Sequence, residues 1–276
     1  MNVSEDEALV ELDAVQTGLA AGVGRVVKAG DRAQGLLDRR VLVGPIDPCG
    51  ECDVCRHGGA AVCPLAKRRD ELGTHVVCAG RWLVPLDDGL ALPTPAAAAV
   101  AGDVALAYTL YARSGVGPRE PVVVVGGSPI ARFLIEILLA KGITPTAVAA
   151  PGPWTDWLVR KGVEVARDRA ALTAAIAAQS FGTKSWRVIC GAPAALPDAV
   201  ELAGPRAMLT LLATPALPPI PGEVIAREVS LLGVAGAHPD LVVETAAMCV
   251  KGEIDLAGGT TLEASDPLCT HVRVLR

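Results

Sequence analysis

The chain has 276 residues, of which 51% are hydrophobic, 20% are charged and only 3% are aromatic. This composition is typical of a globular protein with one large or two modest domains, and it excludes fibrous and disordered classes. The 25 lysines and arginines stand against 30 aspartates and glutamates, which gives a net charge of −5, and no basic block occurs. We therefore expect no nucleic acid and no anionic membrane surface as a partner.

The sequence is apolar overall, with a mean hydropathy of +0.42, but charged residues interrupt each long apolar stretch. Asp103 breaks the alanine-rich run that begins at Pro95, and Arg132 and Glu136 break the run after Pro121. A membrane-crossing helix needs about 20 consecutive apolar residues, so no span is expected. The first residues are acidic, whereas a signal peptide begins with positive charges. We therefore expect a cytoplasmic protein.

The first third of the chain is predicted to be a small β-rich domain at residues 1–95. Alternating or β-branched runs predict extended segments at 7–15, 22–27, 40–43 and 81–85. Two prolines, at 93 and 95, end this domain because they do not continue the interior of a sheet. A cysteine-rich lobe occupies residues 44–67 within it.

From residue 96 onward, short β-branched runs alternate with alanine-rich amphipathic runs. A helical segment at 96–114 leads into six predicted strands, at 121–125, 146–149, 163–166, 186–190, 207–212 and 229–234. Predicted helices lie between them, at 130–141, 154–161, 170–179 and 197–202. This alternation predicts an α/β fold with a six-stranded, doubly wound Rossmann domain at residues 96–237.

Four of the eight cysteines lie within fifteen residues, at steps of 3, 3 and 8: Cys49, Cys52, Cys55 and Cys63. Two interlocked C-x-x-C turns and a fourth thiol from a returning loop can surround one zinc ion. Four thiolates leave no open coordination position, so such a zinc would be structural. His57 is not needed as a ligand. An iron–sulfur cluster and a set of unrelated buried thiols are the two other interpretations.

The lobe and its surroundings resemble the medium-chain dehydrogenase/reductase superfamily, of the zinc-containing alcohol dehydrogenase type. Gly-Pro precedes the cysteines, residues 22–32 are similar to the strand and turn before the family's lobe, and 114–126 are similar to the entry into its nucleotide-binding domain. Residues 271–276 resemble the final strand. The resemblance implies a truncated GroES-like first domain with one structural zinc per chain, a Rossmann domain, and a segment at 238–276 that returns to the first domain.

The segment that holds the catalytic zinc of that family has no counterpart here. Residues 8–15 resemble its early strand, but Gln16-Thr17-Gly18 stands where a cysteine ligand motif would be. The next residues already match the strand beyond the family's Gly-His-Glu motif. At the third ligand position only Asp103 could bind a metal, and one carboxylate does not hold zinc. The chain is therefore expected to be shortened and to lack a catalytic metal.

The dinucleotide-binding loop is also altered. The resemblance assigns Gly126, Gly127, Ser128 and Ala131 to cofactor binding, but the loop reads G-x-S-x-x-A instead of G-x-G-x-x-G. The first glycine of the tight turn is kept, and the second, where the backbone approaches the pyrophosphate, is lost.

The acidic residue that binds the ribose hydroxyls in such domains is absent as well. It is expected about 20 residues after the loop, where the chain reads Ala149-Ala150-Pro151. No arginine stands in its place to bind a 2′-phosphate. We therefore expect only weak binding of NAD or NADP.

Three functions remain open for this sequence. The first is a degenerate protein without ordinary zinc-dependent alcohol dehydrogenation, which acts as a binding or scaffold subunit. The second is an NAD(P)-dependent oxidoreductase that works without a catalytic zinc. The third is an enzyme of another class that binds a small molecule in the interdomain cleft, with His75, Asp103 and Tyr108 as candidate residues.

Assembly is predicted from the sixth strand of the Rossmann domain. In the superfamily that the chain resembles, this strand commonly pairs with its two-fold mate. Residues 228–235 form an apolar strand with no lysine or proline inside it to protect an edge. We therefore expect a homodimer formed through this strand.

Overall fold

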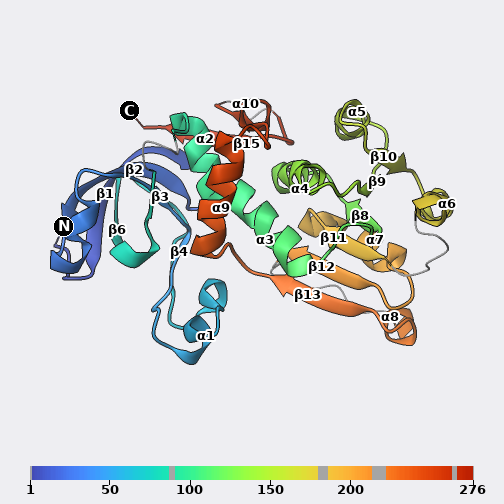
Figure 1. Cartoon of the computed structure of the whole chain (residues 1–276), viewed down its shortest axis with the longest axis horizontal. Coiled ribbons are helices and arrows are strands. Elements are labelled where there is room, and N and C mark those ends of the chain that lie inside the picture. Colours follow the sequence, from blue (N-terminus) through green and yellow to red (C-terminus); the bar gives the residue numbers. More distant parts are fainter. Residues whose placement is uncertain (1, 87–90, 180–185, 213–221, 263–265, 276) are drawn as a thin grey trace. The chain divides into compact units, whose positions relative to one another are not determined.

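The computed structural model describes residues 2–86, 91–179, 186–212, 222–262 and 266–275. The chain divides into two compact units. Unit 1 comprises Met1–Leu106 and Gly236–Arg276, and unit 2 comprises Ala107–Ala235. Figure 1 shows a curled sheet in unit 1 and an open sheet flanked by helices in unit 2. The predicted fold class, a truncated GroES-like domain with a Rossmann domain, is confirmed.

The sheet of unit 1 has the strand order β14-β15-β1-β2-β3-β7, and β6 also pairs with β1. Buried and half-exposed residues alternate along most of β1, so one face of this strand packs into the core, as its sequence pattern predicts. The strands are β1 (Glu7–Gln16), β2 (Gly22–Ala29), β3 (Arg40–Val43), β6 (His75–Ala79), β7 (Val84–Pro85), β14 (Thr260–Thr261) and β15 (Thr270–Val274).

Strand β1 turns directly into β2 through residues 17–21. The Gln16 N–H donates to the Ala21 carbonyl over 2.8 Å, which closes the turn. The two strands then run antiparallel at close range, because a Cβ on Gly24 would lie only 2.2 Å from the Glu11 carbonyl oxygen. In the family that the sequence resembles, a catalytic segment lies between these two strands. In this chain the short hairpin joins them instead.

The helices of unit 1 pack against this sheet. A continuous helical run consists of α2 (Thr94–Ala99), the π-helical turn η5 (Val100–Val104) and α3 (Ala105–Ser114), which continues into unit 2. The run is long and apolar enough to cross a membrane, but 78% of its most apolar window is buried, as in a core helix. The remaining elements are η1 (Asp31–Leu36), η3 (Gly80–Trp82), α9 (Pro239–Val250) and α10 (Leu256–Gly259).

The cysteine lobe is held at its base by a two-stranded sheet of β4 (Ile46–Asp47) and β5 (Lys67–Arg68). Next to it, Arg69 and Asp47 form a buried ion pair at 3.2 Å, and the same Asp47 oxygen accepts from the Ala79 N–H on β6. These contacts join the lobe to the sheet. Two short helices lie within the lobe, α1 (Asp53–Arg56) and η2 (Ala60–Val62).

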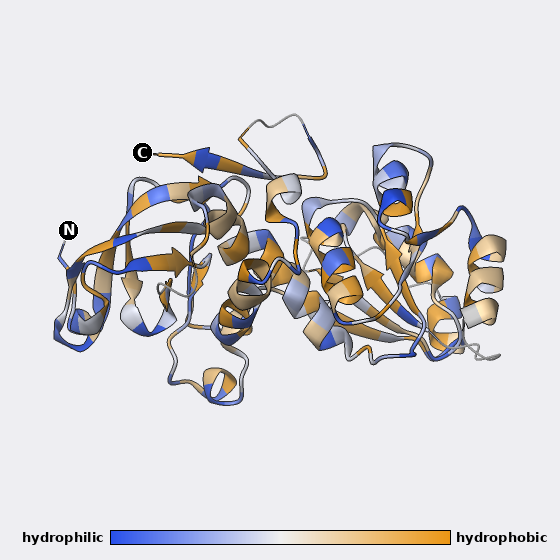
Figure 2. Cartoon of the chain, turned by 45° about the horizontal axis from the view of Figure 1, so that its top comes forward, coloured by the Kyte–Doolittle hydropathy of each residue, from blue (hydrophilic) through white to orange (hydrophobic). Residues whose placement is uncertain are grey.

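Unit 2 contains a parallel sheet with the order β10-β9-β8-β11-β12-β13, the strand order 3-2-1-4-5-6 of a Rossmann domain. Figure 2 shows hydrophobic residues along these strands and on the helices that cover them. The strands are β8 (Val122–Val125), β9 (Thr146–Val148), β10 (Glu164–Ala166), β11 (Arg187–Cys190), β12 (Met208–Leu212) and β13 (Ser230–Val234). The helices are α4 (Pro129–Ala140), α5 (Pro153–Arg160), α6 (Arg169–Gln179), η6 (Pro193–Ala195), α7 (Leu196–Leu202) and α8 (Gly222–Ala226).

The six strands of unit 2 were all predicted from the sequence, within two residues at each end. Unit 1 differs from the prediction in several details. The short strands β4, β5, β6 and β14 were not predicted. The extended run predicted at 81–85 begins as the 3-10 turn η3. The physical reason lies in the cysteine lobe, because the side chains of Arg81 and Trp82 donate to lobe carbonyls and turn the chain toward them.

Candidate functional site

Four thiols converge in the lobe between β4 and β5. Sγ–Sγ distances are 4.0 Å for Cys49–Cys55, 3.8 Å for Cys52–Cys63 and 3.6 Å for Cys49–Cys63, and all four Sγ atoms lie within 4.8 Å of one another. A tetrahedral zinc with Zn–S bonds of about 2.3 Å separates its sulfurs by about 3.8 Å. A multi-iron cluster binds its cysteines through different irons and holds them farther apart. The geometry therefore fits a single zinc ion.

Backbone N–H groups of the lobe donate hydrogen bonds to two of these thiols. The N–H of Cys52 donates to the Cys49 sulfur over 3.4 Å, and the N–H of Cys49 donates to the Cys63 sulfur over 3.5 Å. Backbone hydrogen bonds from Glu51 and Cys52 lower the pKa of Cys49 to about 6. Desolvation raises the pKa of Cys55 to about 12. A bound zinc would deprotonate all four thiols.

Side chains from η3 fix the first turn of the lobe. Arg81 donates to the Cys49 carbonyl over 2.7 Å, and Trp82 Nε1 donates to the Pro48 carbonyl over 2.7 Å. Gly50, at φ +76°, packs so closely on Arg81 that a Cβ would lie 2.8 Å from the guanidinium. His57 is exposed and follows the last residue of α1, and its Nδ1 lies 2.7 Å from the carbonyl of Asp53, the first residue of this helix. It therefore caps the helix and is not part of the four-thiol group.

Gln16, in the stretch that stands where the cysteine ligand motif would be, is hydrogen-bonded to Asp103, at the third ligand position. The Asp103 N–H donates to Gln16 Oε1 over 3.0 Å, and Thr270 donates its hydroxyl to Asp103 Oδ2 over 2.7 Å. Asp103 is only 6% exposed and Thr270 only 1%. Gly102 leaves the space for this contact, since a Cβ there would lie 2.0 Å from Gln16 Oε1. We call Gln16, Asp103 and Thr270 the polar lock.

Burial raises the pKa of Asp103, and the hydrogen bonds from Thr270 and Gln16 offset part of this shift. Among the described residues, the four cysteines of the lobe form the only group of three or more ligand-type side chains close enough to share a metal. The polar lock thus joins strands β1 and β15 to the turn η5, and its side chains are occupied with one another.

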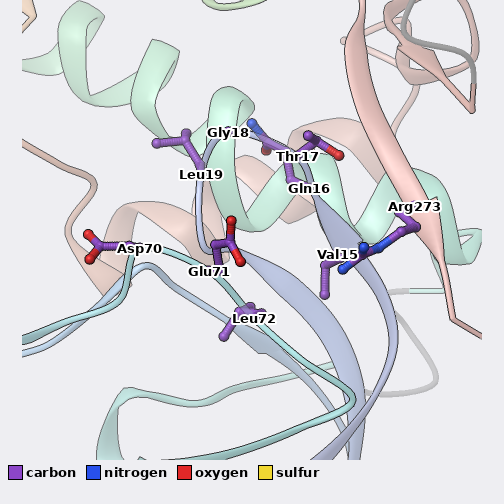
Figure 3. Close-up of a pocket in the computed structure, with 9 residues that line it drawn as sticks. All are labelled: Val15, Gln16, Thr17, Gly18, Leu19, Asp70, Glu71, Leu72 and Arg273. Carbon is purple, nitrogen blue, oxygen red and sulfur yellow. The ribbon is translucent and has the colours of Figure 1, made fainter.

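A small pocket of about 130 Å³ lies beside the β1–β2 turn (Figure 3). It is lined by residues Val15 to Leu19 of the hairpin, by Asp70, Glu71 and Leu72, and by Arg273 of β15. Its size suits a few water molecules and not a dehydrogenase substrate. The hairpin therefore leaves only a shallow depression where the resemblance places a catalytic loop.

The larger crevice lies in unit 2, at the carboxyl end of the parallel sheet. Its volume is about 480 Å³, and it spans the ends of β8 and β9 and the segments after β10 and β11. In open α/β sheets this edge, where the strand order reverses, is the usual ligand-binding position. The lining residues are Val125, Gly126, Gly127, Val148, Ala149, Ala150, Trp154, Arg167, Asp168, Arg169, Ala195, Asp198, Glu201 and Leu202.

Of the four predicted cofactor-binding residues, Gly126 and Gly127 line the crevice. Gly126 has φ +92°, and a Cβ there would lie 2.7 Å from the Ala195 side chain. Ser128 turns away: its hydroxyl donates to the Gly191 carbonyl over 2.6 Å and accepts from the Ala131 N–H over 3.0 Å, which caps α4. Ala131 is buried beneath it. The tight turn and helix start of a dinucleotide loop are thus preserved.

Trp154 forms one wall of the crevice beside the loop. A Cβ on Gly127 would lie 2.9 Å from its indole ring, so the ring packs directly on this glycine. Behind it, Trp157 stacks on Trp154 with ring centroids 5.1 Å apart and planes 9° apart. Trp157 is in turn contacted by Arg132 and Lys161, at 5.2 Å and 5.6 Å from its ring centre. This stack holds Trp154 in place.

Sequence reasoning missed the residues that follow β10. No arginine follows β9, as expected, but Arg167, Asp168 and Arg169 reach the crevice from the neighbouring strand. Asp168 caps α6 through the Ala171 N–H at 2.8 Å, and Arg169 donates to the Glu201 carbonyl over 2.9 Å. The available signal was strand order, because β9 and β10 are adjacent and parallel and their carboxyl ends meet at one edge.

The three residues considered for another class of enzyme each have other surroundings. His75 is exposed on β6, with Nε2 3.6 Å from a Glu11 oxygen. Asp103 belongs to the polar lock. Tyr108 is buried and packs edge-to-face on Tyr111, with ring centroids 5.6 Å apart. None of the three lines either of the two pockets described above.

We predict about one zinc per chain in freshly purified protein, measured by elemental analysis. Cys52→Ser should lose this zinc and lower Tm by about 5 °C or more, because binding energy at a structural site adds to folding energy. Cys269→Ser, which changes a thiol outside the lobe, should keep the full zinc content. A chain without zinc, or with two zincs, or with iron and visible absorbance, would contradict the assignment.

A second prediction concerns the polar lock. The ordinary pKa of an aspartate is 3.8, and burial raises that of folded Asp103. Between these two pKa values the unfolded chain releases the proton more readily, so this group lowers the free energy of unfolding as pH rises. Asp103→Asn removes this effect. As pH increases from 4, the unfolding free energy of Asp103→Asn should therefore rise relative to that of the native chain. The total rise should be about 1.4 kcal/mol for each unit by which burial raises the pKa of Asp103.

Urea unfolding at several pH values measures this difference. Thr270→Val, which leaves Asp103 without its hydroxyl donor, should instead lower the unfolding free energy by about 1–3 kcal/mol. A difference between Asp103→Asn and the native chain that does not change with pH would show that the carboxyl is not perturbed.

No family model matches the sequence. The 2-dehydro-3-deoxy-L-galactonate 5-dehydrogenase of Pseudoalteromonas atlantica is 25% identical over 245 residues, which cover 84% of this chain and 71% of that protein. Among solved structures, an alcohol dehydrogenase (rspB) from E. coli CFT073 in complex with NADH superposes with a TM-score of 0.81 at 16% identity, over 100% of this chain and 94% of that chain.

A zinc-binding dehydrogenase from Sinorhizobium meliloti 1021, bound to NADP, superposes with a TM-score of 0.76 at 15% identity, over 99% of this chain and 93% of that chain. These similarities agree with the two-unit architecture and with the strand order of unit 2. The fold of the chain is therefore that of the medium-chain dehydrogenase/reductase proteins, as the sequence resemblance predicts.

Proposed function

We propose that this chain is a zinc-stabilised, nucleotide-binding relative of the dehydrogenases that acts as a cytoplasmic binding subunit and does not oxidise alcohols by a metal-dependent route. The observation that carries the proposal is the polar lock. Gln16 belongs to the stretch that replaces the cysteine ligand motif, Asp103 stands at the third ligand position, and the Asp103 N–H donates to Gln16 Oε1 in the core.

Metal-dependent alcohol oxidation needs an electrophile that stabilises the developing alkoxide, and a nicotinamide held close to the reacting carbon. In this chain the first requirement is not supplied by the polar lock, because Asp103 is buried and already accepts from Thr270. The zinc lobe does not supply it either, because four thiolates saturate the ion. That zinc would stabilise the fold of the lobe.

The crevice of unit 2 fits part of a dinucleotide. Gly126 makes the tight turn, Gly127 presents backbone at the crevice wall, and Ser128 caps the helix that follows. The carboxylate for the ribose hydroxyls is missing, since Ala149 and Ala150 stand at the end of β9. A bound nicotinamide nucleotide would supply hydride chemistry, while these residues would hold and orient its adenosine-phosphate half.

A second candidate is an oxidoreductase that uses such a nucleotide without a catalytic metal. The preserved crevice favours it, and so do the relatives, which include a dehydrogenase at 25% identity and fold neighbours in complex with NADH and NADP. The two candidates differ in whether bound nucleotide reacts.

Turnover assays separate these functions. We predict no oxidation of simple alcohols with NAD or NADP that a chelator abolishes, and only weak nucleotide binding by calorimetry. Ser128→Gly with Ala150→Asp should strengthen NAD binding and still give no alcohol oxidation. Chelator-sensitive turnover would overturn the proposal, whereas chelator-resistant hydride transfer would establish the second candidate.

We also propose a homodimer formed through β13. This strand is at the edge of the parallel sheet, and Leu231 on it is 39% exposed. An edge strand presents unpaired backbone groups that a two-fold copy can pair with.

Light scattering should therefore give about 56 kDa, twice the chain mass of 28.2 kDa. Leu231→Lys should shift the mass toward that of one chain, because it places like charges on both sides of the two-fold axis. Val159→Lys, at an exposed position on α5, is the matched control and should leave the dimer intact. A native chain that elutes at 28 kDa at micromolar concentration would exclude this assembly.

A further inference from the structure

The residues after β10 suggest which nucleotide the crevice of unit 2 takes; this inference rests on the proposed nucleotide binding. Arg167 lines the crevice and is exposed. Within the described part of the chain it makes no hydrogen bond or ion pair, whereas the neighbouring Arg169 is already bound to the Glu201 carbonyl. A guanidinium without a protein partner at a ligand crevice is available to an anion.

The place of Arg167 in the sheet puts it near the position expected for the ribose of a bound nucleotide. Strand β10 pairs in parallel with β9, and Ala166 is in register with Val148. The residues that follow both strands therefore lie at one edge, and both Arg167 and Ala150 line the crevice. Ala150 stands where a ribose-binding carboxylate is expected. The wall that would contact the ribose thus carries Arg167 and Arg169 together with Asp168, and it has Ala150 in place of the expected carboxylate.

The opposite wall of the crevice carries negative charges. Asp198 and Glu201 line the crevice from α7, which follows β11 on the other side of β8. An anionic group is disfavoured near these carboxylates. On the side of β10, Asp168 lies between Arg167 and Arg169 and accepts from the Ala171 N–H as the cap of α6, so two cations stand beside this one carboxylate. A phosphate is therefore best accommodated on the β9–β10 side.

We propose that the crevice binds an adenine nucleotide that carries a 2′-phosphate, and that Arg167 contacts this phosphate. A carboxylate at the end of the second strand accepts the ribose 2′-hydroxyl of NAD, and a nearby arginine accommodates the 2′-phosphate of NADP. Here the carboxylate is absent and the arginine comes from the third strand. The ligand class is accordingly NADP-like and not NAD-like.

Calorimetric titration with small probes tests the assignment without any turnover. Adenosine 2′,5′-bisphosphate should bind about tenfold more tightly than AMP, and more tightly than adenosine 3′,5′-bisphosphate, which has the same charge. Arg167→Ala should remove this preference and leave AMP affinity within about twofold. Arg160→Ala, an exposed arginine of α5 that does not line the crevice, should change neither affinity. Thermal melting of each variant verifies that it is folded.

The outcomes separate this inference from the proposed function. AMP and NAD binding as tight as, or tighter than, that of their 2′-phosphorylated counterparts would overturn the inference and leave nucleotide binding intact. Equal loss of AMP and 2′,5′-bisphosphate affinity in Arg167→Ala would also overturn it, because the arginine would then act as a general cation. No binding of any of these probes at millimolar concentration would overturn the proposed nucleotide binding itself.

Discussion

The hydrogen bond between the Asp103 N–H and Gln16 Oε1 joins two buried segments of unit 1 that lie far apart in the sequence. Gln16 ends the strand that turns at once into β2, and Asp103 lies in a π-helical turn, a feature often found at functional sites. Thr270 adds the first residue of β15 to the same cluster. Each partner is buried, so loss of any one leaves a polar group unsatisfied in the core. The lock therefore couples the short hairpin to the helical run and the final strand.

Under the proposed function, this arrangement explains how the fold would keep its architecture without a catalytic metal. A bound metal joins side chains from distant segments, and its removal would leave polar ligands facing one another in a buried place. Here an amide, a carboxyl and a hydroxyl satisfy one another and perform the same joining role. The cysteine lobe is different, because its four thiols, with Sγ–Sγ distances of 3.6–4.0 Å for three of the pairs, have the spacing of ligands around one cation.

Sequence patterns predicted most of the fold because its signals are local. The β-branched runs, the Ser128-Pro129 helix start and the C-x-x-C turns each depend on neighbouring residues. The polar lock was not predicted, since residues 16, 103 and 270 meet only through long-range packing. The position of Arg167 at the crevice was not predicted for the same reason, because the crevice edge is built from strands that are adjacent in space.

The nucleotide loop shows how one substitution is accommodated by its surroundings. Loss of the second glycine puts a hydroxyl at Ser128, which is directed inward to the Gly191 carbonyl and so remains satisfied away from the crevice. Gly127, between the first two motif positions, leaves the space for the Trp154 ring, which packs directly on it. The stack of Trp154 on Trp157, with cations beside Trp157, then fixes this wall. Under the proposed 2′-phosphate binding, the charged side chains along the rim of the crevice would therefore set its selectivity more than the loop, whose tight turn and helix start are preserved.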